Sequence, residues 1–161
     1  MGWVFSQTLV GSNFVPTLQN SNIKFTQNDI ENIFEIIIST DNVLKEEFKS
    51  YIKEEYKDNK HERLNYFDIA VISRYVIERL KNGQTENFDT FFEAVENIIN
   101  NCDTEIENLI VIGLFEGIQN LGGAEINYYT SFDKWLKPLS KLKWDKLIDS
   151  WEGEDWRKIK K

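Results

Sequence analysis

Apolar residues recur at helical spacing along most of this chain, and polar residues fill the positions between them. The first such segment follows Thr26, whose pairing with Asp29 three residues later is typical of a helix start. The predicted apolar face of this helix consists of Ile30, Ile33, Phe34 and Ile37. The polar stretch "STDN" at 39–42 then predicts a break or bend.

Two more helices are predicted, over residues 44–56 and 66–82, with a polar connection at 57–65. The earlier one repeats an apolar residue every four positions, at Leu44, Phe48, Ile52 and Tyr56. Lysine and glutamate fill its other positions, which predicts a mixed-charge outer face. The later one closes at Gly83, in the position that glycine usually takes after a helix C-terminus.

Thr85 is the predicted cap of the next helix, which has two clearly different faces. Its apolar side carries Phe88, Phe91, Phe92, Val95, Ile98 and Ile99. Its outer side is expected to carry Glu86, Asp89, Glu93 and Glu96. A further helix is predicted from a capping box of Thr104 and Glu107 to the pair Gly122 and Gly123.

The C-terminal part is also expected to be helical. Thr130 and Asp133 resemble a helix start before "FDKWL", and Pro138 is placed as a first-turn proline. An apolar face is then predicted from Leu139, Leu142, Leu147, Ile148 and Trp151. Residues 1–25 show no sustained period and are expected to form an irregular, extended arm against the body. With no strongly alternating segment and no repeat, the sequence predicts an all-α, single-domain bundle (residues 1–161) of about six or seven helices.

The segment "EIENLIVIGLFEGIQNLGG", residues 105–123, places one acid, Glu116, at the end of an apolar run. That run is too short for a membrane span, which needs roughly 20 apolar residues, so we interpret the segment as the central core helix. Gly113 and Gly117 are then expected to allow close helix contact. Glu116 becomes a structural, buried or half-buried anchor that requires a cation, because an unpaired buried charge is costly. The candidate partners are Arg63, Arg74 and Arg79.

The composition favours a soluble, folded protein without catalytic machinery. The chain has 41% hydrophobic residues, too many for a disordered protein, and no secretory signal is recognisable at its N-terminus. Cys102 is the single cysteine, which excludes an internal disulfide and favours a cytoplasmic location. His61 is the single histidine and lies in a polar connection, so no Glu-x-x-His metal site and no histidine-based active site is formed. We therefore expect no enzyme activity, no metal and no cofactor.

Negative charge is concentrated in one part of the chain. Residues 82–133 hold ten acids and no lysine or arginine, whereas residues 134–161 hold nine basic and five acidic residues. An acidic stretch repels nucleic acid and anionic membranes and attracts a basic protein. The alternative is that these acids form only a solvated face.

Two passages together resemble a known family: "NLIVIGLFEGIQN" at 108–120 and "WLKPLSKLKWDKLIDSWEG" at 135–153. The matching residues are Leu114, Glu116, Gln119, Asn120, Leu136, Pro138, Ser140, Trp144, Leu147, Trp151 and Gly153. The family is an uncharacterised group of small, helical bacterial proteins, many encoded beside polymorphic toxins and regarded as candidate immunity proteins. The resemblance implies a helical fold, with structural roles for residues such as Trp144 and Trp151.

Resemblance and charge together predict a cytoplasmic immunity protein that binds a cognate toxin domain and occludes its active site. The partner is expected to be basic, with a nuclease as one candidate, and neither nucleic acid nor membrane is an expected partner. The predicted binding surface comprises Glu86, Asp89, Glu93, Glu96, Asp103, Glu105 and Glu107. A helical adaptor for another protein is the alternative, and a small enzyme using Glu116 is the third hypothesis.

Overall fold

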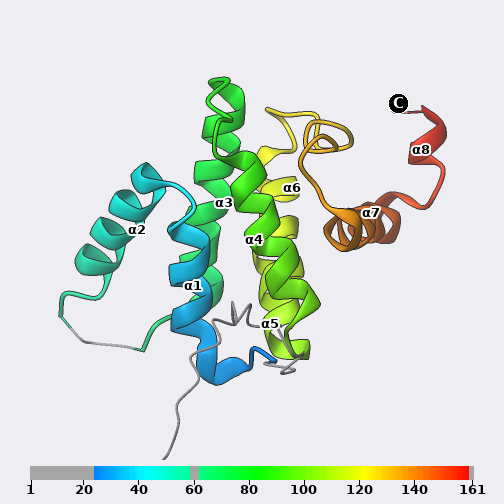
Figure 1. The fold of residues 1–161 in the computed structure, drawn as a ribbon. Coiled ribbons are helices and arrows are strands. Elements are labelled where there is room, and N and C mark those ends of the chain that lie inside the picture. The colour runs from blue at the N-terminus through cyan, green and yellow to red at the C-terminus, as the bar shows by residue number, and fades with distance from the viewer. Residues whose placement is uncertain (1–23, 59–61, 160–161) are drawn as a thin grey trace, which may run out of the picture.

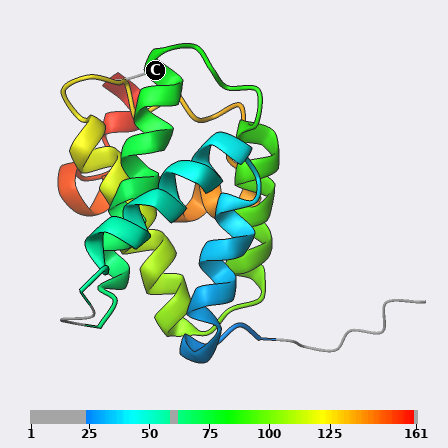
Figure 2. The same ribbon diagram turned by 90° about the vertical axis from the view of Figure 1, so that its left-hand side faces the viewer.

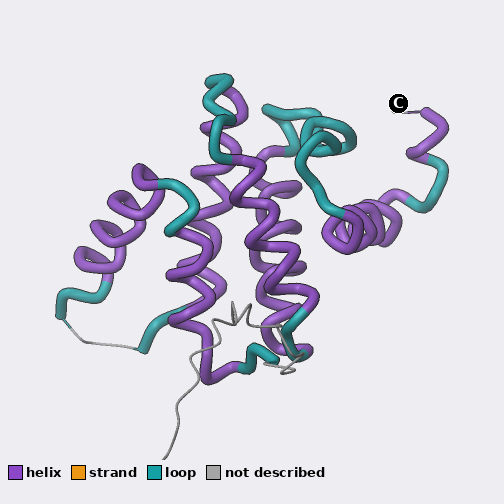
Figure 3. Tube along the Cα trace, in the orientation of Figure 1, coloured by secondary structure: helices purple, strands orange, loops and turns teal. Residues whose placement is uncertain are grey.

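The computed structural model describes residues 24–58 and 62–159, and their architecture is all-α, as the sequence predicts. The α-helices are α1 (Ile30–Ile38), α2 (Asn42–Glu55), α3 (Asn65–Lys81), α4 (Phe88–Asn100), α5 (Thr104–Asn108), α6 (Glu116–Gly122), α7 (Pro138–Glu152) and α8 (Trp156–Ile159). A 3₁₀ turn, η1 (Gln27–Asp29), precedes α1, and a π-helical segment, η2 (Leu109–Phe115), joins α5 to α6. Figure 3 shows how little of the described chain lies outside helices.

The helices form a bundle with α3, η2 and α6 at its centre. In Figure 1, α1 and α4 stand in front of α3 and α6, α2 leans away on one side, and α7 lies on the other. Packing contacts join α3 to η2 and α6, α4 to α7, α1 to α4, and α2 to α3. Figure 2 shows the same bundle from the side of α2. Because α3 and the continuous segment of η2 and α6 lie between the other helices, the side chains with which they pack are mainly apolar.

The core contains a group of large aromatic side chains where α4, η2 and α7 meet. Phe92, Phe115, Phe132 and Trp144 are all fully buried. The Trp144 ring lies 5.5 Å from the Phe115 ring and 5.3 Å from the Phe132 ring, measured between centroids. Its indole N–H donates a 3.0 Å hydrogen bond to the carbonyl of Tyr128. Trp144 therefore fastens α7 to the bundle, in agreement with the predicted structural role.

The central helix contains the predicted close approach. A methyl group on Gly113 would lie 2.6 Å from Cγ2 of Ile69, and one on Gly117 would lie 2.7 Å from Oγ of Ser73. The expectation that these glycines allow close helix contact is confirmed. Gly117 follows Gly113 by four residues, and Ser73 follows Ile69 by four residues, so α3 and the central helix run in the same direction. The expected regular helix is wrong in one respect, since η2 winds as a π-helix.

Several predicted helix ends are confirmed. Thr26 and Asp29 form a capping box before α1, α3 ends two residues before Gly83, and Pro138 is the first residue of α7. Gly83 has φ of +69°, a conformation that glycine adopts at little cost. The break at 39–42 is also observed, and Asp41 within it caps α2 through the backbone amide of Val43.

Four predictions about helix ends and helix faces are wrong. The cap of α5 is Asp103 and not Thr104, because the Asp103 carboxylate accepts from the amide of Ile106 at 3.0 Å. Thr85 does not cap α4, which begins at Phe88 after Asn87. The "FDKWL" region forms turns before α7. On α7, Trp151 is 41% exposed and Leu142 is 48% exposed, so the buried face runs instead through Ser140, Trp144, Leu147 and Ile148.

The expected N-terminal arm lies mostly outside the described residues. Its last residue, Phe25, forms a bridge with Cys102, in which the Phe25 amide donates to the carbonyl of Asn101 and the Asp103 amide donates to the carbonyl of Phe25. These bonds fix the described start of the chain beside the N-terminus of α5.

No helix among the described residues is long and apolar enough to cross a membrane.

Candidate partner-binding surface

Two of the predicted binding residues are exposed on α4 and share one cation. The side chains of Asp89 and Glu93 are 75% and 59% exposed. The ammonium of Lys137, the residue before α7, lies 2.7 Å from the Asp89 carboxylate and 3.5 Å from the Glu93 carboxylate. Two carboxylates therefore face one ammonium, and this part of the surface keeps a negative charge. The contact with Asp89 raises the pKa of Lys137, so the lysine stays charged at neutral pH.

Glu96 is the main correction to the predicted surface, because it is buried and not on the outer face. Its carboxylate accepts hydrogen bonds from the amides of Leu139 and Ser140 at 2.9 and 2.7 Å, and from the Ser140 hydroxyl at 2.5 Å. A helix start has unpaired amides and a partial positive charge, which a carboxylate satisfies. Glu96 of α4 therefore caps α7 from a neighbouring helix.

The electrostatics of Glu96 follow from this position. Burial alone would raise the pKa of Glu96, but the hydrogen bonds from the Ser140 hydroxyl and from the Leu139 and Ser140 amides outweigh it. The net pKa lies below the ordinary value for glutamate. The ionised carboxylate is thus the form that holds α4 and α7 together, and it is not available to a partner.

The other predicted binding residues differ in the contacts that their carboxylates make. Glu86 forms an ion pair with Arg79, and Glu107 lies 2.6 Å from the ammonium of Lys143 on α7. Asp103 is occupied in capping α5. Glu105 is exposed on the same short helix. The structure thus brings Asp89 and Glu93 together, whereas Glu96 and Asp103 cap the N-termini of α7 and α5.

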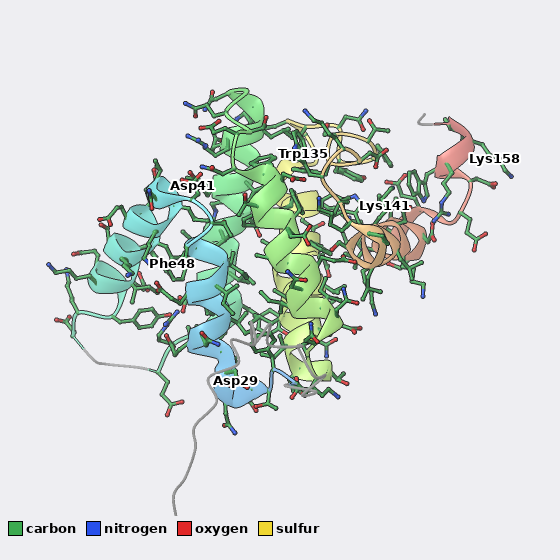
Figure 4. All side chains as sticks on the ribbon, viewed as in Figure 1. Asp29, Asp41, Phe48, Trp135, Lys141 and Lys158 are labelled. Atoms are coloured by element: carbon green, nitrogen blue, oxygen red, sulfur yellow. The ribbon has the colours of Figure 1, made fainter. Side chains whose placement is uncertain are left out.

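The charge separation along the sequence is partly offset in space. Lys137, Lys141 and Lys143 all come from the basic C-terminal part, and each contacts an acid of residues 82–133. Asp133, for example, lies 3.1 Å from the ammonium of Lys141, which is labelled on α7 in Figure 4. The two oppositely charged parts of the sequence are therefore neighbours in the fold.

Glu116 is half-buried, but the predicted arginine partner is not found among the described residues. Its carboxylate accepts a long, 3.4 Å hydrogen bond from the Asn120 side chain, one turn later on α6. Arg63 instead pairs with Asp68 and Glu31, and Arg79 lies within ion-pair distance of Asp41 and Glu86. The expectation of a cation for Glu116 is wrong in the described part of the chain.

The buried charge that needs a cation is Asp68 of α3, which the sequence reading missed. Asp68 is fully buried and accepts from the hydroxyls of Tyr51 and Tyr56 and from Nε of Arg63, at 3.0, 2.7 and 2.9 Å. The Arg63 guanidinium also lies 5.1 Å from the centre of the Phe34 ring. Asp68 thereby joins α2 and the connection after it to α3. A possible signal was its position one residue before Ile69 on the apolar side of the helix.

A second buried carboxylate, Asp41, also lies outside the predicted set. It caps α2 and accepts a 2.8 Å hydrogen bond from the hydroxyl of Tyr75 on α3. Burial would raise the pKa of Asp41, but its hydrogen bonds outweigh that effect and lower it. Figure 4 shows Asp41 at the start of α2, away from α7. Both missed carboxylates therefore join helices.

The described surface has shallow clefts but no cluster with metal-binding character. A cleft of about 260 Å³ between α1 and α2 is lined by Phe34, Phe48 and Arg63 among others, and one of about 410 Å³ between α2 and α3 by Tyr75, Arg74 and Arg79 among others. No group of three or more potential metal ligands occurs in residues 24–58 and 62–159. Asp89 and Glu93, the exposed acids of α4, are therefore the part of the predicted binding surface that we retain as the candidate site.

Comparison with known proteins gives a family for most of the chain. Residues 42–152 match the family described as Domain of unknown function (DUF7674). The chain belongs to the DUF7674 family. The DUF7674 match begins with the first residue of α2 and ends with the last residue of α7. It therefore includes Glu96 with the helix start that it caps, and Asp68 with its tyrosine and arginine partners. No curated protein and no solved structure matches the chain.

Proposed function

We propose that this protein is an immunity protein that binds a basic toxin domain through the exposed acids of α4 and occludes the active site of that domain. The observation that carries the proposal is the pair Asp89 and Glu93, two exposed carboxylates that share the single ammonium of Lys137. The resemblance of residues 108–120 and 135–153 to candidate immunity proteins supports the same function. Cytoplasmic location is part of this proposal.

The arrangement suits recognition of a cationic surface. A guanidinium from a partner can bind one carboxylate while Lys137 keeps the other, so association needs no buried charge to be uncovered. Complementary charges at an interface accelerate encounter and weaken with added salt. Glu105, which is exposed on α5, is a further acid that a basic partner could contact. A complex of ordinary size would bury about 800 Å² on each partner.

The test combines Asp89→Lys with Glu93→Lys. The chain is co-expressed with each product of the genes adjoining its own that proves toxic by itself, and cell survival and the Kd of the purified pair are measured. We expect the double variant to lose protection and to bind at least 100-fold more weakly. The matched control is Glu46→Lys with Glu55→Lys, which reverses two exposed acids on α2.

The results separate the function from the surface. Full protection by the Asp89 and Glu93 variant would refute the surface assignment and leave the immunity function standing. Failure of the unmodified chain to protect against, or to bind, the adjoining toxin would refute the immunity function. Stable capture of a housekeeping protein in place of a toxin would favour the alternative, a helical adaptor.

A further inference from the structure

Large apolar side chains remain exposed along α3 and the central helix, the continuous segment of η2 and α6. They include Tyr66, Ile112 and Leu121, whose exposed fractions are 51%, 45% and 42%. Tyr66 lies beside Ile112, because its Cδ1 atom is 3.4 Å from the position of a methyl group on Gly113, the next residue. Leu121 lies further along, where it lines a cleft of about 290 Å³ together with Arg74 of α3. Apolar surface is thus exposed at two levels where these helices run together.

One cation and one acid without an ion-pair partner lie between these two levels. Every other arginine of the chain pairs with an acid, whereas Arg74 has no carboxylate within ion-pair distance among the described residues. The half-buried Glu116 carboxylate accepts a 3.4 Å hydrogen bond from an amide side chain and likewise has no cation in the described part of the chain. Glu116 follows Ile112 by four residues and Arg74 follows Tyr66 by eight, so helical spacing places each charge on the side of its helix that carries the exposed apolar residue.

The two charges also lie at the same level of the bundle. A methyl group on Gly117 would lie 2.7 Å from Oγ of Ser73, so the two helices approach most closely there. Glu116 directly precedes Gly117, and Arg74 directly follows Ser73. Each molecule therefore presents a cation on α3 and an acid on the neighbouring helix, at one level of the same face.

A face of this kind is complementary to a second copy of itself. Most soluble homo-oligomers are dimers with a two-fold axis. An axis parallel to α3 that passes between the two helices places Arg74 of each copy opposite Glu116 of the other, and Tyr66 opposite Ile112. An axis perpendicular to the helices would place like charges opposite each other, which is unfavourable. We propose that two copies of this chain form a symmetric dimer through this face, with two Arg74–Glu116 ion pairs across it.

The size of the face indicates the strength of the dimer. The 17 residues of α3 are about 25 Å long, and two helices side by side are about 20 Å wide, so the face measures about 500 Å². That is less than the 800 Å² or so that each partner buries in a complex of ordinary size. We therefore expect a Kd in the micromolar range, with the apolar contacts supplying affinity and the ion pairs fixing the orientation.

Complementary charge reversal in the full-length chain tests the proposal. Arg74→Glu and Glu116→Arg each place like charges opposite one another in a dimer of identical chains. A mixed dimer of one Arg74→Glu chain and one Glu116→Arg chain regains both ion pairs. Analytical ultracentrifugation measures the Kd of each variant and of their equimolar mixture at micromolar to millimolar concentrations. We expect each variant alone to dimerise at least tenfold more weakly and the mixture to recover to within threefold of the unmodified chain.

The matched controls make the same reversals at exposed positions of α2. Lys53→Glu and Glu55→Arg should keep the Kd of the unmodified chain, and circular dichroism checks that every variant keeps its helices. None of these variants alters Asp89 or Glu93, so the result is independent of the proposed function.

Three results would overturn the proposal. The unmodified chain could stay monomeric throughout this concentration range. It could form a dimer that neither Arg74→Glu nor Glu116→Arg weakens, which would place the contact on another face. Weakening by each variant without recovery in the mixture would show that the two charges do not pair across the dimer.

Discussion

Replacing the buried cap Glu96 by glutamine is expected to destabilise the protein strongly, although the two side chains have nearly the same shape. The carboxylate accepts three hydrogen bonds from the start of α7. A hydrogen bond to a charged group contributes about 1.5–3 kcal/mol, against about 1 kcal/mol for a neutral one. The glutamine amide also has only one accepting oxygen, so its NH₂ group faces donors. We therefore expect Glu96→Gln to lower the free energy of unfolding by about 2–4 kcal/mol.

Urea unfolding followed by circular dichroism measures this change. With a slope of about 2 kcal/mol per molar urea, the midpoint should fall by about 1–2 M. The matched control is Glu93→Gln on the same helix, where the side chain is 59% exposed and its contact with Lys137 is worth at most about 1 kcal/mol. Equal midpoints for Glu96→Gln and the unmodified chain would refute the view that this carboxylate holds α7.

The same carboxylate gives the stability a defined pH dependence. Because the pKa of Glu96 is lower in the folded protein than its ordinary value of 4.5, the folded state favours the ionised form. Its contribution is fully present above the ordinary pKa and is lost as the pH falls through the lower, folded value. The difference in unfolding free energy between the unmodified chain and Glu96→Gln should therefore be largest near pH 7 and shrink below pH 4.5. A difference that stays constant down to pH 3 would contradict this explanation.

Three other substitutions, together with one control, test the packing of the bundle by the same urea assay. Gly113→Ala should cost about 1–3 kcal/mol, since its methyl group would lie 2.6 Å from the buried, branched side chain of Ile69, and a gain in stability would refute the close approach. Asp68→Asn should cost about 3–5 kcal/mol, because it removes the charge that an arginine and two tyrosine hydroxyls face, and an unchanged midpoint would contradict that. Trp144→Ala should lower the free energy of unfolding by about 3–5 kcal/mol. Trp151→Ala, at a 41% exposed position, should lower it by less than about 1 kcal/mol. Equal losses would contradict the observed orientation of α7.

Local sequence patterns predicted most of the helices because helix formation depends on neighbours three and four residues apart. The capping box at Thr26, the glycine after α3 and the first-turn proline of α7 each act within one turn, so they can be recognised from the chain alone. The close helix contact at Gly113 and Gly117 was predictable for a similar reason, since small residues one turn apart lie on one side of a helix. Cap assignments at Thr85 and Thr104 were wrong because other residues nearby could begin the same helix.

Only the tertiary structure decided the role of each carboxylate. Glu93 and Glu96 are three residues apart on one helix and have the same chemistry, yet one is exposed and the other caps α7. Which of them is buried depends on where α7 packs, and that contact joins residues more than 40 positions apart. The same long-range packing brings the basic C-terminal part against the acidic stretch. The sequence determined the helices and the total charge, whereas the fold determined which charges remain available to a partner, because electrostatic pairing depends on distance in space.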